Sequence, residues 1–124
     1  TEAQFENTMR LIRDVRFDMV HAAAYSPRPG TAAARWPDDV PPEEKERRRA
    51  LVEETQAQIA GEINARLLGQ EVEILVDGRQ RGRWRGRTRG NKLVFFESDT
   101  SWLGRLARVR VTWAGPWSMI GELP

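Results

Sequence analysis

Apolar residues near the start of the chain recur every three or four positions, which is the spacing of one face of a helix. The residues on this face are Phe5, Met9, Leu11, Ile12 and Val15. Thr1 and Gln4 have the spacing of a capping box, which sets a helix start at the beginning of the chain. We therefore expect a first helix from about Glu2 to Asp14.

A short apolar run follows between residues 16 and 25. Phe17, Val20 and Tyr25 in this run are consistent with a buried strand, so the helix and strand together look like one unit of an α/β fold. A single strand leaves its N–H and C=O groups without partners. We therefore expect residues 1–25 to pair with sequence outside this chain, or to form a homo-oligomer or a strand swap. The start at Thr1, without an initiator Met, suits a fragment.

A proline-rich segment separates this region from a second helical pattern. Five of the seven prolines lie between residues 26 and 42, which indicates a long loop. Residues 43–68 then predict the longest helix, with acidic residues in its first turn and Gly69 as its C-terminal cap. Its apolar stripe is typical of core packing. The stripe consists of Val52, Ile59, Ile63 and Leu67.

From Gly69 onward the hydrophobic period changes from helical to two, which indicates strands. Strands are predicted at residues 70–76, 82–88, 91–96, 106–113 and 117–123, with Asp77-Gly78 as a turn after the first. Five short strands joined by glycine-rich turns suit a small OB-like antiparallel β-barrel. We therefore expect an α+β chain, in which a helix, strand, loop and long helix over residues 1–68 precede a five-stranded barrel over residues 69–124.

The composition excludes several kinds of site. The 124 residues include no cysteine, so a disulfide, a thiolate nucleophile and a cysteine-bound cluster are excluded. With His21 as the sole histidine we expect neither a metal site nor a catalytic triad, and we expect His21 to be packed. No apolar run is long enough to span a membrane, so a cytoplasmic chain is expected.

Positive charge is concentrated in the second half of the chain. Residues 1–68 hold 10 basic and 12 acidic residues, whereas residues 69–124 hold 10 basic and 6 acidic ones. Eighteen of the twenty cations are arginine, whose planar fork suits phosphate and stacks on bases. This bias favours nucleic acid over a merely solvated face.

An arginine occupies every odd position from 79 to 89. On one strand these side chains would share a face and repel each other, so an anion such as an RNA or DNA phosphate is expected opposite them. A flexible arginine-glycine loop and a charged strand edge remain alternatives.

Among the tryptophans, Trp84 is expected to stack on a base, whereas most of Trp102, Trp113 and Trp117 are expected in the core. The RNA-binding candidates in this stretch are Arg79, Arg81, Arg83, Trp84, Arg85, Arg87 and Arg89.

Two segments carry a family resemblance. The stretch Gly86 to Val94, preceded by residues 72–78 and followed by residues 104–121, resembles the TRAM domain, a β-barrel RNA-binding module of tRNA-modifying enzymes. The stretch Tyr25 to Ala32, with the loop and long helix after it, resembles the end of the radical-SAM barrel of the tRNA methylthiotransferases, although Ala32 stands where the family usually has proline. Together the two segments cover essentially the whole chain.

This resemblance implies a function. Family members use two [4Fe–4S] clusters and S-adenosylmethionine to place a methylthio group on an isopentenylated adenosine next to the anticodon of tRNA. The cysteines that hold both clusters are absent here, so the chain is expected to be a C-terminal part that contains no cofactor, lacks catalytic residues and works with the N-terminal catalytic part of the same enzyme. The alternatives are a structural domain that packs on the catalytic barrel and the related branch that modifies a ribosomal protein.

The resemblance also implies roles for particular residues. Arg87, Asn91 and Lys92 fall on the TRAM motif and are expected to bind RNA. Arg28 falls in a loop near the substrate end of the barrel, where the ribosomal-protein branch tends to have acidic residues. Arg28 therefore favours the tRNA branch.

Overall fold

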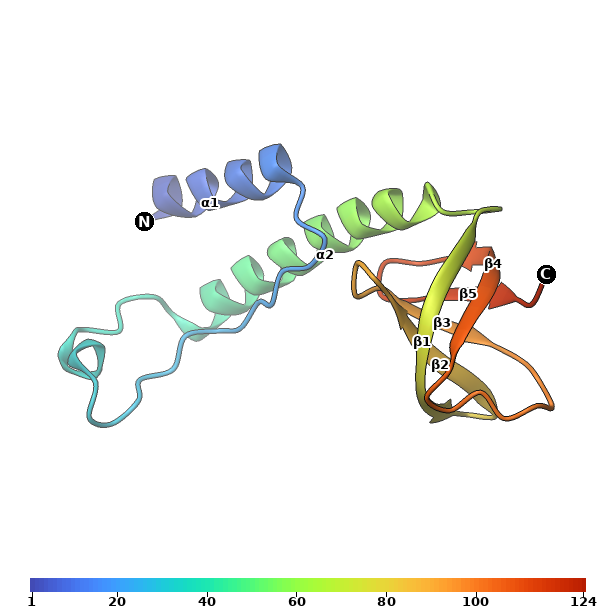
Figure 1. Ribbon diagram of the computed structural model, residues 1–124. Coiled ribbons are helices and arrows are strands. Elements are labelled where there is room, and N and C mark those ends of the chain that lie inside the picture. Colours follow the sequence, from blue (N-terminus) through green and yellow to red (C-terminus); the bar gives the residue numbers. More distant parts are fainter. The chain divides into compact units, whose positions relative to one another are not determined.

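The computed structural model describes all residues from 1 to 124 and divides into two compact units, residues 1–56 and residues 57–124. Figure 1 shows two helices and a small β-barrel along the chain. None of its helices is long and apolar enough to cross a membrane.

Helix α1 (Glu2–Val15) confirms the first helix expected from the sequence. The Thr1 hydroxyl accepts a hydrogen bond of 3.2 Å from the Gln4 N–H, and the Gln4 side chain accepts one of 2.8 Å from the Thr1 ammonium. The predicted capping box is therefore present, and it satisfies donors that a helix start otherwise leaves free. The helix ends at Arg16, whose φ of 55° is left-handed.

The strand expected at residues 16–25 is not formed. Residues 19–28 belong to no helix or strand, and Phe17, Met19 and Tyr25 are exposed. The prediction of a buried strand is wrong for this chain, because no other strand in its unit supplies a hydrogen-bonded edge. A short 3-10 helix, η1 (Ala32–Arg35), follows within the proline-rich region, capped by the Thr31 hydroxyl.

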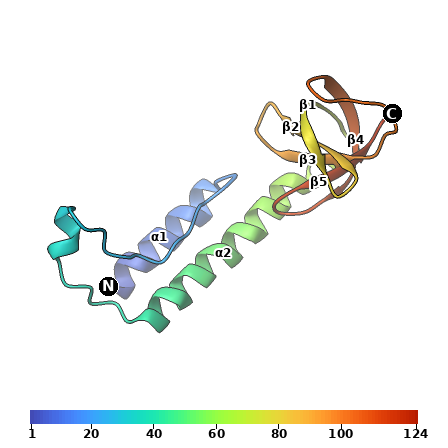
Figure 2. The same ribbon diagram turned by 90° about the horizontal axis from the view of Figure 1, so that it is seen from below.

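Helix α2 (Pro42–Ala65) is the predicted long helix. In the first unit, α1 lies alongside the first half of α2, with Met9 and Ile12 buried (Figure 2). After Ala65 the chain tightens into turns, with the N–H of Leu67 donating to the Asn64 carbonyl at 2.9 Å. Gly69, at φ 75°, then redirects the chain, but it does not cap α2 as predicted, because its N–H donates to the Val111 carbonyl at 2.8 Å.

An ion-pair cluster joins the starts of the two helices. Glu44 accepts hydrogen bonds from Arg47 at 2.8 Å and from Arg48 at 2.7 Å, and Arg47 also reaches Glu2 of α1 at 2.9 Å. The hydrogen bonds from Arg47 and then Arg48 lower the pKa of Glu44 from 4.5 to about 2. Both guanidinium groups also lie over the ring of Phe5, with their central carbons 5.8 and 5.3 Å from the ring centroid.

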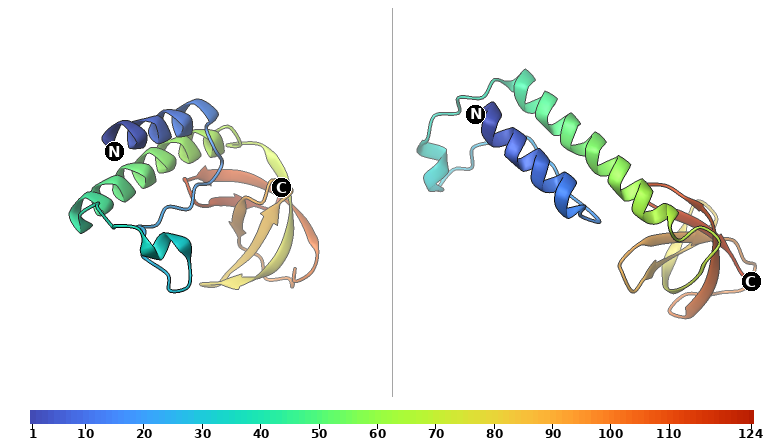
Figure 3. Two further views of the ribbon diagram at one scale, coloured as in Figure 1. Left: turned by 90° about the vertical axis from the view of Figure 1, so that its left-hand side faces the viewer. Right: turned by 90° about the horizontal axis from the view of Figure 1, so that it is seen from above.

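The second unit contains the predicted five-stranded barrel, which is closed in the order β1-β2-β3-β5-β4 (Figure 3). All neighbouring strands are antiparallel except β3 and β5, which run parallel. A closed barrel leaves no free sheet edge. The strands are β1 (Glu71–Gln80), β2 (Arg83–Thr88), β3 (Leu93–Phe96), β4 (Leu106–Ala114) and β5 (Met119–Glu122).

Alternating residues of the strands fill the barrel. Phe96 packs edge-on against Trp102 with ring centroids 5.9 Å apart, so Trp102 packs against the core as expected, although its own ring is only partly buried. Each fully buried apolar side chain of this size contributes about 1.5–3 kcal/mol relative to exposure. The other large buried side chains are Ile74, Val76, Trp84, Val94, Val109, Val111 and Met119.

Two irregularities interrupt the alternation. The pairing of β1 with β2 shifts between Val76 and Gly78, and the pairing of β4 with β5 shifts between Val111 and Trp113. The turn predicted at Asp77-Gly78 is therefore wrong, because these residues form a bulge inside a longer strand.

Candidate nucleic-acid interface

The arginine-rich stretch is divided between two strands and a turn. Arg79 lies in β1, and the chain reverses at Arg81 and Gly82, which have φ values of 51° and 82°. Two successive positive φ values between paired strands indicate a type I′ hairpin. The six arginines thus do not share one strand face, and that prediction is wrong because Arg81-Gly82 supplies the turn.

Within β2 the predicted alternation is present. Arg83, Arg85 and Arg87 point away from the barrel, whereas Trp84 and Gly86 are buried. Trp84 is 7% exposed, and its indole N–H donates to the Ser98 carbonyl at 3.0 Å. The prediction that Trp84 stacks on a base is therefore wrong, because its ring fills the core. The Arg79 guanidinium lies 4.8 Å from the centroid of that ring.

The anion expected opposite the arginines is found within the barrel itself. Three guanidinium groups pair with carboxylates: Arg83 with Glu97 at 3.1 Å, Arg85 with Asp77 at 2.9 Å, and Arg89 with Glu73 at 3.3 Å. All three pairs are partly solvent-exposed, so each contributes at most about 1 kcal/mol to stability. The repulsion expected from the sequence is thus relieved without nucleic acid.

In two of these pairs the terminal nitrogens of the guanidinium group remain available. Arg83 and Arg85 each donate to their carboxylate through Nε. The two terminal nitrogens of each group have no hydrogen-bond partner in the chain, and paired terminal N–H groups are what binds a phosphate bidentately. The outer face of β2 therefore presents two oriented guanidinium groups to solvent.

The β2–β3 hairpin carries the residues of the TRAM motif. Asn91 has a φ of 62°, and its N–H donates to the Thr88 carbonyl at 2.9 Å. The Thr88 hydroxyl accepts a hydrogen bond of 3.1 Å from the Lys92 N–H. Arg87 donates to the Asn91 carbonyl at 3.1 Å, and the side chain of Arg89 is 91% exposed. The hairpin is thus internally bonded and projects cationic side chains.

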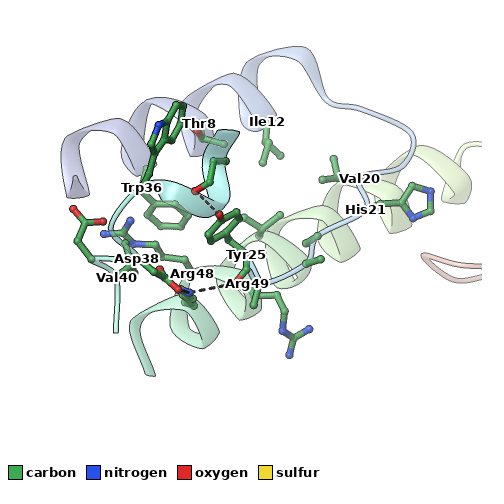
Figure 4. Close-up of a pocket in the computed structure, with 18 of the residues that line it drawn as sticks. Thr8, Ile12, Val20, His21, Tyr25, Trp36, Asp38, Val40, Arg48 and Arg49 are labelled. Atoms are coloured by element: carbon green, nitrogen blue, oxygen red, sulfur yellow. Dashed lines mark hydrogen bonds and ion pairs between the residues drawn. The ribbon is translucent and has the colours of Figure 1, made fainter. Parts of the chain in front are cut away.

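Arg28 lies in the first unit, on the segment before η1. Its carbonyl accepts a hydrogen bond of 2.8 Å from the Thr31 hydroxyl, and its side chain is exposed. A pocket of about 590 Å³ in the same unit is lined mainly by apolar side chains, with Tyr25 bonded to the Ala33 carbonyl at 3.3 Å (Figure 4). Arg28 is not among its lining residues, whereas His21 is, and His21 is exposed instead of packed as expected.

Two tryptophans lie outside the core, contrary to the prediction. Trp113 is 51% and Trp117 is 53% exposed. Trp113 has the same parity as the buried Val109 and Val111, but the bulge before it turns its side chain outward. Trp117 lies in the turn before β5, where no strand alternation applies. The Ala-Gly-Pro-Trp turn was the signal in the sequence that these rings leave the barrel interior.

The structure contains no group of three or more histidine, cysteine, aspartate or glutamate residues arranged to hold a metal ion. The titratable residues of the barrel are instead distributed over its outer face as arginine–carboxylate pairs.

The barrel is similar to a known family of domains. The TRAM domain model matches residues 65–123. A weak structural likeness, with a TM-score of 0.40 and 16% identity, exists to a Streptococcus pneumoniae multidomain protein with nucleic acid binding domains, covering 47% of this chain and 23% of that one.

The whole chain also matches longer proteins named tRNA-2-methylthio-N(6)-dimethylallyladenosine synthase. It is 56% identical to the Roseiflexus protein and 50% identical to that of Chloroflexus aurantiacus, over 99% and 98% of this chain and 27% of each relative. The Dehalococcoides mccartyi protein is 47% identical over 99% of this chain and 30% of its own length. The chain thus spans less than a third of these relatives. Over its whole length it is similar to one part of these relatives, and its residues 65–123 match the TRAM domain model.

Proposed function

We propose that this chain is the RNA-binding C-terminal part of a tRNA methylthiotransferase, acting on an isopentenylated adenosine next to the anticodon. The observation that carries the proposal is the set of cations on β2 and the β2–β3 hairpin, within a domain that matches the TRAM family. The names of the relatives favour tRNA over a ribosomal protein as the substrate.

In this proposal the hairpin makes the main phosphate contacts. Arg87 and Lys92 flank its turn, Asn91 shapes it, and Arg89 is almost fully exposed. Arg83 and Arg85 add their open terminal nitrogens along β2, and Arg79 and Arg81 extend the basic surface to the β1–β2 turn. Contacts of this kind position RNA without reading its sequence.

The catalytic chemistry is assigned to the rest of the enzyme. Iron–sulfur clusters of the expected kind are held by cysteine thiolates, and this chain contains no cysteine. The two [4Fe–4S] clusters and S-adenosylmethionine therefore belong to the N-terminal catalytic part of the cytoplasmic enzyme. Residues 1–68 complete its radical-SAM barrel, with Arg28 facing the substrate.

Salt-dependent binding of an anticodon stem-loop RNA tests the proposal. Raising salt from about 50 to 200 mM should weaken binding steeply, and Arg87→Ala or Lys92→Ala should each lower the slope of log affinity against log salt by about one. Arg10→Ala is the matched control, because it removes one exposed arginine of α1 and leaves the barrel unchanged. Binding that does not depend on salt, or equal slopes for all variants, contradicts the proposal.

A second role is favoured by the surface of the first unit. Leu11, Val15, Phe17 and Met19 are exposed along the end of α1 and the segment after it. Several large apolar side chains exposed in one short stretch of sequence favour an interaction surface. We therefore also propose that residues 1–25 pack on the N-terminal catalytic part, or form a homo-oligomer when that part is absent. Light scattering that finds a monomer at all concentrations, together with no capture of the catalytic part, contradicts this role.

A further inference from the structure

The turn between β4 and β5 presents two tryptophan rings at the surface of the barrel. Trp113 and Trp117 lie on either side of Gly115 and Pro116, and both are half exposed. Large apolar rings are normally buried, and tryptophan at a surface is enriched where a partner binds. We therefore expect a binding partner to cover these two rings.

The turn is rigidly built. A Cβ at Gly115 would collide with the Trp113 ring, so the ring lies directly against the Gly115 backbone. The N–H of Gly115 donates to the Ser118 carbonyl at 2.9 Å. The buried side chain of Asn64, on α2, donates to the Gly115 carbonyl at 2.8 Å and to the Pro116 carbonyl at 3.3 Å. Both rings thus project from a fixed backbone.

Trp113 also continues an outward-facing apolar row across three strands. It is paired in register with Ile120 of β5, which is paired with Phe95 of β3. Phe95 lies between the buried Val94 and Phe96, and Ile120 lies between two buried residues, so both side chains face out. Phe95 is in turn paired with Arg85 of β2, which joins this row to the basic strand.

The cationic hairpin lies at the same end of the barrel as this turn. Strands β3 and β5 are parallel, so their first residues lie at the same end. Lys92 immediately precedes β3, and Trp117 and Ser118 immediately precede β5. A chain held by its phosphates at the hairpin can therefore place neighbouring groups over the two rings.

We propose that Trp113 and Trp117 form a stacking platform for unpaired RNA bases, a role that rests on the RNA-binding function proposed above. The cations at the same end favour a polyanion over a protein as the occupant. Unstacked bases have flat apolar faces that stack on aromatic side chains, as single-stranded RNA does on other barrel domains. The hairpin holds the phosphate backbone of the RNA, and the two tryptophans select RNA whose bases are unpaired.

Binding of a looped RNA and of a fully paired RNA duplex to the complete chain tests this proposal. Trp113→Ala and Trp117→Ala should each weaken binding of the looped RNA about five- to tenfold, the low end of the range for loss of one base–aromatic stack. Neither substitution should alter the salt slope or duplex binding, because neither removes a cation. Trp113→Phe and Trp117→Phe should restore part of the affinity.

Trp36→Ala is the control, because Trp36 is 70% exposed but lies in the first unit. Circular dichroism confirms that each variant is folded. If looped RNA binds wild type with the expected salt slope but the tryptophan variants bind equally well, the platform is overturned while the RNA-binding function stands. If wild type binds no RNA, or if the variants lose only association with a protein, the platform is overturned as well.

Discussion

Substitution of Gly86 by alanine should destabilise the barrel although it adds only one methyl group. A Cβ at Gly86 would lie 2.7 Å from the Leu75 carbonyl oxygen and 3.0 Å from the Ile74 Cδ1. The first of these atoms belongs to the backbone of β1, so relief requires the paired strands to separate. Overpacking of this kind costs about 1–3 kcal/mol.

Gly90→Ala is a closely matched control for this substitution. Gly90 lies four residues further along, in the β2–β3 hairpin, where the nearest atom to an added Cβ is the Thr88 hydroxyl oxygen at 3.8 Å. Neither glycine has a positive φ, so the two variants differ in the space available and not in backbone strain.

Thermal unfolding followed by tryptophan fluorescence measures the difference, because Trp84 is buried in the barrel. A loss of about 2 kcal/mol corresponds to a decrease in Tm of roughly 8–16 °C for a domain of this size. Gly90→Ala should unfold close to wild type. Equal Tm values for the two variants would refute the steric argument.

Three further predictions concern single contacts. Asn64→Ala removes the buried amide that binds the Gly115 carbonyl, so urea unfolding should show a loss of about 1–3 kcal/mol. Asp77→Asn frees the Arg85 guanidinium, so it should tighten RNA binding and steepen its salt dependence; weaker binding would mean that Asp77 mainly orients Arg85. The pKa of Glu44 is lowered to about 2, so its contribution to stability is fully present above pH 4.5 and is lost as the pH falls through 2. Carboxyl NMR titration of Glu44 with a midpoint near 4.5 would contradict this.

The barrel could be predicted from the sequence because its strands alternate regularly. Val72, Ile74 and Val76 share one face as expected, and Val109 and Val111 point inward between exposed arginines. The two helices were equally clear, since the capping box and apolar spacing set α1 and the prolines set the start of α2. Local pattern and final structure agree in these elements because each one buries a single face.

The candidate site was predicted less well, because bulges and turns break the two-residue period. A bulge at Gly78 looked like a turn, and a bulge before Trp113 turned outward a ring that was expected to help fill the small barrel. Trp84 was expected to stack on a base because it lies beside the arginines, yet side chains from the other strands surround it. One inserted residue exchanges the faces of a strand, and a single sequence does not reveal it.

The carboxylates opposite the arginines change what can be inferred from the positive charge of the barrel. Repulsion among the arginines no longer implies a bound RNA, because three carboxylates already neutralise half of the arginine series. These carboxylates are Asp77, Glu73 and Glu97. These pairs are exposed and weak, so a phosphate can approach the open terminal nitrogens without a large loss of stability. The pairs lower the general attraction of the barrel for any polyanion. Discrimination of RNA from other polyanions then has to come from the geometry of the binding surface. The internally bonded hairpin and the two tryptophans beyond it are the parts of this domain that supply such geometry.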